Sequence, residues 1–131
     1  GPPVKVNVGN PHEVKIIFPQ EFDRLPETLI PWNKKANNEW VCRETAQDLR
    51  MRVWERGTGE TLACGTGAVA VAAAFIEDTL PERKRCEAQP PKDTIFNVHL
   101  RGGTLQIEKL SNNHYLLTGP ATYCFSGAIN I

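Results

Sequence analysis

Hydrophobic and polar positions alternate over short runs in the first part of the chain, with turn residues between the runs. Residues 4–8 and 13–18 are rich in valine and isoleucine, and the Gly-Asn-Pro-His stretch between them is typical of a turn. Residues 37–44 and 49–56 alternate in the same way. We predict two pairs of strands. The connection over residues 19–36 carries three prolines, so we expect a loop with at most a short helical turn.

A different pattern begins at Cys64, where Cys-Gly-Thr-Gly is followed by an almost unbroken run of alanine, valine and other apolar residues as far as Ile76. Alanine is the strongest helix former, and a helix that is apolar on every side is a buried helix. Asp78 and Pro81 are residues typical of its end. We therefore predict one buried helix over about residues 65–78.

The last third of the chain again reads as strands. Residues 94–110 form two runs joined through Gly102 and Gly103, which predicts a hairpin. Residues 114–131 predict two further strands with a Thr-Gly-Pro break between them. The whole pattern predicts an α+β fold, with mostly antiparallel strands curled around one central buried helix. A length of 131 residues favours a single domain over residues 1–131.

Charge and hydropathy exclude some classes of function. Lysine plus arginine and aspartate plus glutamate both number 15, so the net charge is zero. This balance argues against nucleic acid or an anionic membrane surface as the main partner. The sequence contains no apolar run long enough to cross a bilayer and no segment typical of a secretory signal. We expect a cytoplasmic protein.

The four cysteines are widely separated along the chain, at Cys42, Cys64, Cys86 and Cys124. They form no Cys-x-x-Cys motif and no cluster with histidine at metal-ligand spacing, so we predict no metal site. Free thiols in a reducing compartment fit this spacing better than disulfides. Cys42, Cys86 and Cys124 stand in no motif and are interpreted as ordinary thiols.

Cys64 stands out because it lies where the predicted helix begins. A helix N-terminus exposes unpaired N–H groups and the positive end of a dipole, and glycines let a ligand come close to the backbone. The glycines around Cys64 therefore predict a cradle for a carboxylate. The same field would lower the pKa of the Cys64 thiol and prepare it as a base or nucleophile. From these residues alone, an inert buried cysteine remains the alternative interpretation.

Three blocks of the sequence resemble the diaminopimelate epimerase family, in the order that the family has them. Arg-Val-Trp-Glu-Arg-Gly-Thr-Gly-Glu-Thr-Leu-Ala-Cys-Gly-Thr-Gly-Ala, residues 52–68, is similar to the family's second signature. Residues 6–14 and 116–129 continue the match on either side. The resemblance implies interconversion of LL- and meso-diaminopimelate, in lysine and peptidoglycan biosynthesis. Proton transfer by two cysteines at the α-carbon needs no pyridoxal phosphate, metal or other cofactor.

The resemblance also implies roles for individual residues. Cys64 takes the place of one of the two catalytic cysteines, and His12 and Glu55 would tune the pKa values of the thiols. Contacts with the amino-acid substrate would come from Asn10, Asn37, Glu55, Arg56, Gly65 and Thr66. Gly65 and Thr66 would offer their backbone N–H groups to the α-carboxylate. Phe125 matches an aromatic residue associated with dimer packing in the family, so we expect a homodimer.

The family's first signature, which carries the other catalytic cysteine, has no counterpart here. Neither Cys42 nor Cys86 is followed by glycines. The chain thus corresponds to the C-terminal half of a two-domain epimerase, and its expected partner is an N-terminal half-domain that carries the second cysteine. Because inversion needs a group on each face of the carbanion, we predict that the isolated chain is inactive.

Two alternatives stay open at this point, and two others are disfavoured. The chain could serve a racemase of another amino acid on the same scaffold, or be a non-catalytic carboxylate-binding or scaffolding module. Phenazine-pathway isomerases share the fold, but they do not rely on the cysteine at position 64. A thiol redox protein would need a resolving cysteine nearby, and no cysteine pair has the short spacing that this requires.

Overall fold

The computed structural model describes residues 2–76, 95–110 and 114–119. Within them the chain forms eight strands: β1 Val4–Asn7, β2 Pro11–Ile16, β3 Asn37–Arg43, β4 Asp48–Glu55, β5 Gly59–Thr61, β6 Ile95–Leu100, β7 Gly103–Lys109 and β8 Tyr115–Thr118. The helices are α1 Pro19–Asp23 and α2 Gly65–Ile76. None of the helices described is long and apolar enough to cross a membrane.

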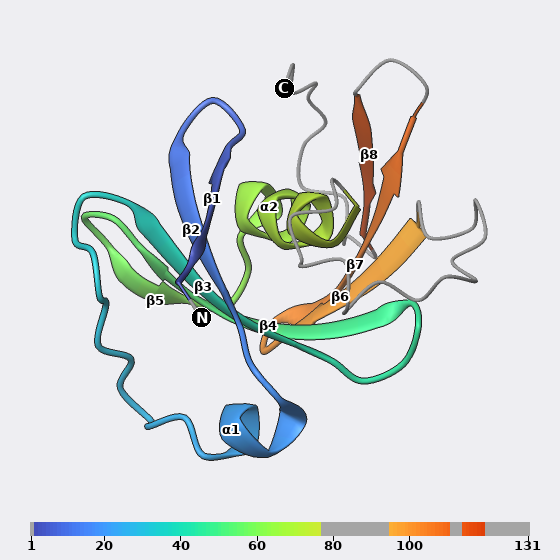
Figure 1. Cartoon of the computed structure of the whole chain (residues 1–131). Helices are drawn as coiled ribbons and strands as arrows, with labels where there is room; N and C mark the ends of the chain where they lie inside the picture. Colours follow the sequence, from blue (N-terminus) through green and yellow to red (C-terminus); the bar gives the residue numbers. More distant parts are fainter. Residues whose placement is uncertain (1, 77–94, 111–113, 120–131) are drawn as a thin grey trace.

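All eight strands join one sheet in the order β1-β2-β3-β4-β6-β7-β8, with β5 paired to β4. The sheet is mixed and curls into a half-barrel (Figure 1). Strands β2 and β3 run parallel, as do β4 and β6, whereas the other five pairs are antiparallel. The predicted antiparallel majority is therefore confirmed. The parallel pairs arise where a long connection lies between the strands, since parallel pairing requires a crossover rather than a tight turn.

The predicted hairpins are confirmed, with shifts of one or two residues. Strands β1 and β2 pair in the register Val6↔His12, and the turn between them includes Gly9, whose φ of 96° suits glycine. Strands β6 and β7 pair as far as Leu100↔Gly103, so the loop consists of Arg101 and Gly102. Strand β8 is the first of the two strands expected after residue 114, and the second lies outside the described residues.

Helix α2 begins at Gly65, as predicted, and runs to Ile76, while residues 77 and 78 lie outside the described residues. Its buried residues form one continuous stretch, Gly67 to Ala74. The helix contacts every strand except β5 and lies between the β1–β2 and β7–β8 ends of the sheet (Figure 1). Because most of its side chains are alanine and valine, the curled sheet can approach its backbone closely, and each buried valine contributes about 1.5–3 kcal/mol.

Strand β5 is an element that the sequence analysis did not predict. Glycines before the helix were interpreted together as a cradle, yet Gly57 and Gly59 have φ values of 82° and 95° and build the tight turn from β4 into β5. The pair Glu55↔Gly59 closes this hairpin. Only Gly65 and Gly67 belong to the start of α2. The short hairpin brings the chain from Glu55 back toward the helix start, which positions Glu55 beside Cys64.

Candidate active site

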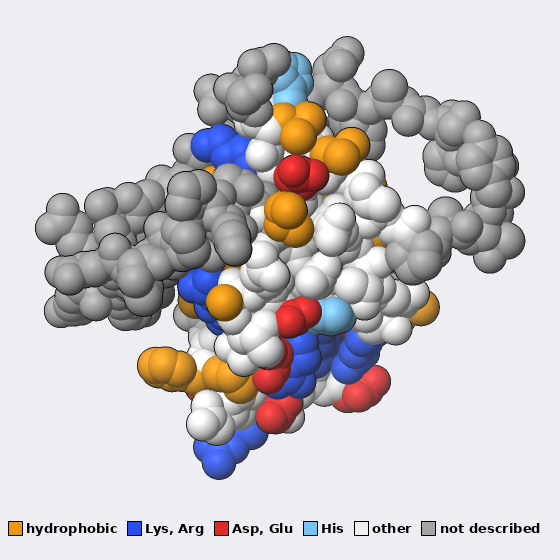
Figure 2. Space-filling view, turned by 90° about the vertical axis from the view of Figure 1, so that its right-hand side faces the viewer, with side chains coloured by type: hydrophobic (Ala, Val, Ile, Leu, Met, Phe, Trp, Pro, Cys, Tyr) orange, Lys and Arg blue, Asp and Glu red, His pale blue; other side chains and the backbone are white. Residues whose placement is uncertain are grey.

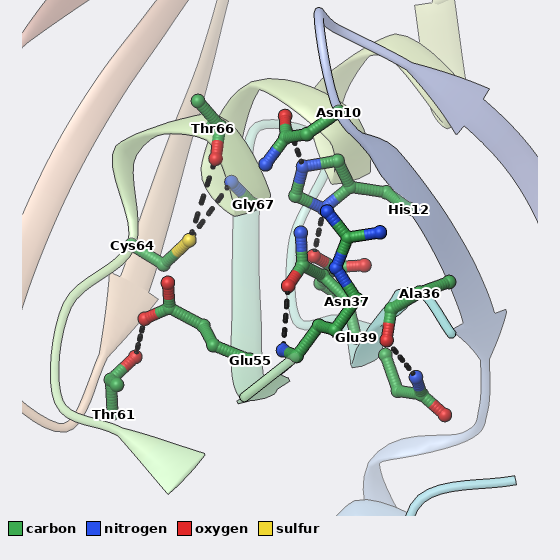
Figure 3. Close-up of polar contacts among 12 residues, drawn as sticks. Asn10, His12, Ala36, Asn37, Glu39, Glu55, Thr61, Cys64, Thr66 and Gly67 are labelled. Atoms are coloured by element: carbon green, nitrogen blue, oxygen red, sulfur yellow. Dashed lines mark hydrogen bonds and ion pairs between the residues drawn. The ribbon is translucent and has the colours of Figure 1, made fainter. Parts of the chain in front are cut away.

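Cys64 is the N-cap residue of α2. Its carbonyl accepts the N–H of Ala68 at 2.9 Å, and its Sγ accepts the N–H of Gly67 at 3.3 Å. A sulfur atom thus does what a serine or threonine oxygen does at most helix starts. The Thr66 hydroxyl lies 3.6 Å from Sγ, and the cysteine is 7% exposed (Figure 3). The predicted place of Cys64 at the helix N-terminus is confirmed, and both Cys64 and Cys42 are free thiols.

The pKa of the Cys64 thiol is raised, so the expectation that the helix start lowers it is wrong. Burial is the largest cause, because it penalises the charged thiolate. Hydrogen bonds from Thr66 and from the Gly67 N–H act in the opposite direction, and the negative charges of Glu55 and Glu39 raise the pKa further. Burial and the two carboxylates therefore destabilise the thiolate by more than the helix terminus stabilises it. Cys64 rests as a neutral thiol.

Gly67 makes a close approach possible between the helix and two side chains. A Cβ at this position would stand 3.1 Å from Sγ of Cys64, 3.1 Å from Oε1 of Glu39 and 3.3 Å from Cε of Met51. Such distances are shorter than ordinary van der Waals contact, so any larger residue would displace its neighbours. The glycine thus places the thiol and the Glu39 carboxylate around one small space.

His12 and Glu39 form a buried pair on neighbouring parallel strands. Nδ1 of His12 is hydrogen-bonded to Oε1 of Glu39, and both side chains are inaccessible to solvent. Nε2 of His12 lies 3.2 Å from Oδ1 of Asn10 in the preceding turn. Burial raises the pKa of the Glu39 carboxyl, although its contact with His12 counteracts this. The structure therefore brings the predicted residues Asn10 and His12 together, with Glu39 as a third member (Figure 3).

Glu39 is the residue that the sequence analysis missed. In the alternating stretch 37–44, a glutamate beside Trp40 resembles a solvent-facing strand position. Yet β3 lies between β2 and β4 in the middle of the sheet, and all of its residues except Arg43 are buried. One signal could have found it. Several polar residues stand together in a strand with neighbours on both sides, so some of them must be buried, and a buried charge requires a partner.

The Asn37 side chain is hydrogen-bonded to the backbone of Arg56. The N–H of Arg56 donates to Oδ1 of Asn37 at 2.8 Å, and the Arg56 guanidinium donates to the carbonyl of Lys35 at 3.2 Å. Glu55, one residue earlier, accepts a hydrogen bond from the Thr61 hydroxyl of β5. Asn37 thus fixes the end of β4, where Glu55 lies near Cys64 (Figure 3). The Arg56 side chain is exposed.

The neighbouring Asn38 has a different role. Its Oδ1 accepts the backbone N–H groups of Trp32 and Asn33, and its Nδ2 donates to the carbonyls of Asn33 and Ala36. All of its hydrogen-bonding capacity is directed to the loop before β3. Asn38 therefore holds that loop, and Asn37 is the asparagine whose side chain lies at the site.

The remaining predicted positions lie either in the first turn of α2 or outside the described residues. Gly65 and Thr66 are the first two residues of α2, where backbone N–H groups have no intrahelical acceptor. Phe125 and the cysteines at positions 86 and 124 lie outside the described residues. Within the described part of the chain, no three histidine, cysteine or acidic side chains are grouped closely enough to hold a metal ion.

Comparison with known sequences identifies relatives over almost the whole chain. The sequence model of the family described as diaminopimelate epimerase matches residues 4–124. The diaminopimelate epimerase of Desulforapulum autotrophicum is 43% identical over 96% of this chain and 43% of its own length. That of Methanococcus maripaludis is 42% identical over 96% of this chain and 44% of its own length. The chain spans less than half the length of these curated relatives.

Solved structures with a similar fold belong to phenazine biosynthesis proteins of the PhzF family. The protein from Bacillus anthracis matches 85% of this chain and 34% of its own, with a TM-score of 0.50 and 23% identity. The protein from Enterococcus faecalis matches 78% of this chain and 35% of its own, with a TM-score of 0.51 and 16% identity. At these identities the likeness concerns the fold alone. On the family match and the identity to its curated relatives, this chain belongs to the diaminopimelate epimerase family.

Proposed function

We propose that the chain is the C-terminal half of a diaminopimelate epimerase and supplies one of the two faces of its active site. The observation that carries this proposal is the position of Cys64, a buried thiol at a helix N-terminus beside Glu55 and the His12–Glu39 pair. In this proposal the helix α2 is the central element of one half of a two-half architecture. The partner half carries the second cysteine.

The helix start would bind the substrate's α-carboxylate. The N–H groups of Gly65 and Thr66 point out of the first turn of α2, and the helix dipole favours an anion there. Asn10, Asn37 and Arg56 surround the same region with amide and guanidinium groups for the rest of the amino acid. Holding the carboxylate beside Sγ of Cys64 would place the adjacent α-carbon within reach of the thiol.

Cys64 then exchanges a proton with one face of the α-carbon. Because it rests as a thiol, it donates its proton to the carbanion while the partner's thiolate breaks the C–H bond on the opposite face. The electron pair of the broken C–H bond ends in the new C–H bond, and Cys64 is left as a thiolate. In the reverse direction, this thiolate removes the proton and the partner's thiol supplies one.

The test combines this chain with the N-terminal half of a relative and measures deuterium incorporation at the α-carbon of diaminopimelate in D2O. We expect exchange and epimerisation only when both halves are present, and none when Cys64→Ser replaces the wild-type chain. Turnover by this chain alone, abolished by Cys64→Ser, would refute the half-site proposal. Equal activity on other amino acids would favour the alternative of a racemase with different specificity. Diaminopimelate binding without exchange would favour a carboxylate-binding module.

A further inference from the structure

Glu39 is buried with only half of its carboxylate satisfied. Oε1 is bound to Nδ1 of His12, whereas Oε2 is inaccessible to solvent and has no hydrogen-bond partner in the described part of the chain. Buried carboxylate oxygens are seldom left in this state, because the cost of removing the oxygen from water is then not offset by a hydrogen bond. Glu39 therefore has a position that the fold alone does not account for.

The contacts of His12 determine how many protons the pair holds. Nε2 faces the carbonyl oxygen of Asn10, which only accepts hydrogen bonds, so Nε2 carries a proton. One further proton lies between Nδ1 and Oε1 of Glu39. Whether it belongs to the imidazole or to the carboxyl, the net charge of the pair is zero. A neutral pair is the least costly state for two groups without access to solvent.

The pair lies directly beside Cys64, with only the hydrogen of Gly67 where a side chain would stand. Oε1 of Glu39 and Sγ of Cys64 each lie 3.1 Å from the position of a Gly67 Cβ. Glu55 faces this region from β4. Lys5 and Glu13 lie opposite each other on β1 and β2, on the other face of the sheet from the His12 side chain, where Glu13 accepts hydrogen bonds from Trp32 and Asn33. Helix α2 carries no ionisable side chain.

We propose that Glu39 is the positioning residue of this site: bound to Nδ1, it fixes the His12 ring with Nε2–H toward Asn10 and keeps the pair uncharged beside Cys64. This rests on the proposed function of Cys64 as a proton donor. An isolated imidazolium at the same place would attract negative charge to the sulfur and favour the thiolate. With Glu39 present, His12 orients Asn10 without adding a positive charge, and the thiol keeps its proton until the substrate is bound.

The first experiment observes the shared proton by NMR of the chain, without substrate or a partner half. We expect a far-downfield proton resonance, protected from exchange with water, assigned to Nδ1 of His12. It should disappear in Glu39→Gln and persist in Asp48→Asn. Asp48 makes the other histidine–carboxylate contact, with His99 at 2.9 Å, but that pair is 40% and 35% exposed. A wild-type spectrum without this resonance overturns the proposal without any variant.

The second readout is the pH dependence of Cys64 alkylation, followed at the Cys64 peptide by mass spectrometry. In the wild type we expect one ionisation step, that of the thiol. In Glu39→Gln the ring titrates alone, so a second step should appear and alkylation below about pH 6.5 should be at least about threefold faster than in the wild type. Glu13→Gln changes the residue next to His12 on β2 and should leave the profile unchanged. A single-step profile in Glu39→Gln also overturns the proposal.

These measurements need no turnover, so they separate the two proposals. Failure of the combined halves to exchange the α-proton would refute the proposed function and leave the His12–Glu39 result standing. Absence of the shared-proton resonance in a chain that completes an active epimerase would refute only the role of Glu39.

Discussion

The two faces of β4 carry charged residues in opposite circumstances. On the face toward α2, Glu55 lies near Cys64 and accepts a hydrogen bond from the Thr61 hydroxyl, and no cationic side chain pairs with it in the described part of the chain. On the opposite face, Arg52 is 6% exposed and binds both oxygens of Glu60 at 2.7 Å. The same strand thus presents a carboxylate without an ion pair on one face and a fully bonded cation on the other.

The outer face is compensated throughout its described part. Arg52 also donates to the carbonyls of Pro26 and Glu27, both at 2.9 Å, and so holds the loop that follows α1. Arg50 binds Asp23 and Glu44, and acidic and basic side chains alternate around a histidine on this side of the molecule (Figure 2). A hollow of about 410 Å³ lies among these groups. Paired charges fix structure here, whereas Glu55 on the other face of the strand lies without an ion pair near the Cys64 thiol.

The largest effect should follow from breaking the compensated face. Arg52→Met leaves Glu60 and two carbonyls without their donor, and we expect the free energy of unfolding to fall by about 3 kcal/mol, as for a buried ion pair that loses one member. Arg50→Met is the matched control, because its ion pairs are exposed to solvent and should cost at most about 1 kcal/mol. Urea denaturation measures both. Equal losses would show that burial of Arg52 has no energetic consequence.

A smaller loss of stability should follow from filling the space at Gly67, between α2 and the sheet. Gly67→Ala places a Cβ against Cys64 and Glu39, and overpacking of this kind costs about 1–3 kcal/mol. Gly65→Ala is the control: its Cβ would meet Leu117 at 3.6 Å, an ordinary contact, so helix propensity should leave stability unchanged or improved. Thermal unfolding of the two variants compares them. Identical melting temperatures would contradict the close approach at Gly67.

The smallest effect concerns the thiol itself. Glu55→Gln removes a negative charge that raises the pKa of Cys64, so alkylation of Cys64 at neutral pH should become about two- to fivefold faster. Glu44→Gln, which changes the carboxylate 3.7 Å from the Cys42 sulfur, should not alter the rate at Cys64. Mass spectrometry of the labelled peptides distinguishes the two cysteines. A slower reaction in Glu55→Gln would show that Glu55 does not raise the pKa of Cys64.

The same pKa direction makes stability depend on pH. Because the thiol pKa is higher in the folded chain than in the unfolded chain, the unfolded state binds fewer protons at alkaline pH. The contribution of Cys64 is complete below about pH 8.5 and declines as the pH rises above that value. Cys64→Ser should remove this part of the alkaline loss of stability, which denaturation at neutral and alkaline pH would detect.

The sequence predicted the hairpins, the start of α2 and the position of Cys64 because these depend on local patterns. Turn residues such as Gly9 and Gly102 and the apolar run after Gly65 specify their elements without long-range information. The two parallel pairings were not predictable in this way, since they join strands separated by long connections. Strand β5 was missed because its two glycines were assigned to the helix rather than to a hairpin turn.

The structure brings together residues that the resemblance assigns to one site, whereas the electrostatics expected there are wrong in direction. Asn10, His12, Asn37, Glu55 and Cys64 lie together at the start of α2. The direction of the Cys64 pKa was wrong, because the field of a helix terminus is a local property whereas desolvation depends on everything that packs around the sulfur. Glu39 was missed for the same reason: only the neighbours of β3 make it a buried charge.

The sulfur cap of α2 has a consequence for evolution and for experiment. Serine is a better N-cap than cysteine, because its oxygen is a stronger hydrogen-bond acceptor than sulfur. If Cys64 acts as proposed, the chain keeps the weaker cap where the reaction requires a thiol, and gives up some folding stability for function. Replacing Cys64 by serine should leave the first turn of the helix at least as firmly closed. Loss of proton exchange in that variant would then report the missing sulfur rather than a loosened helix.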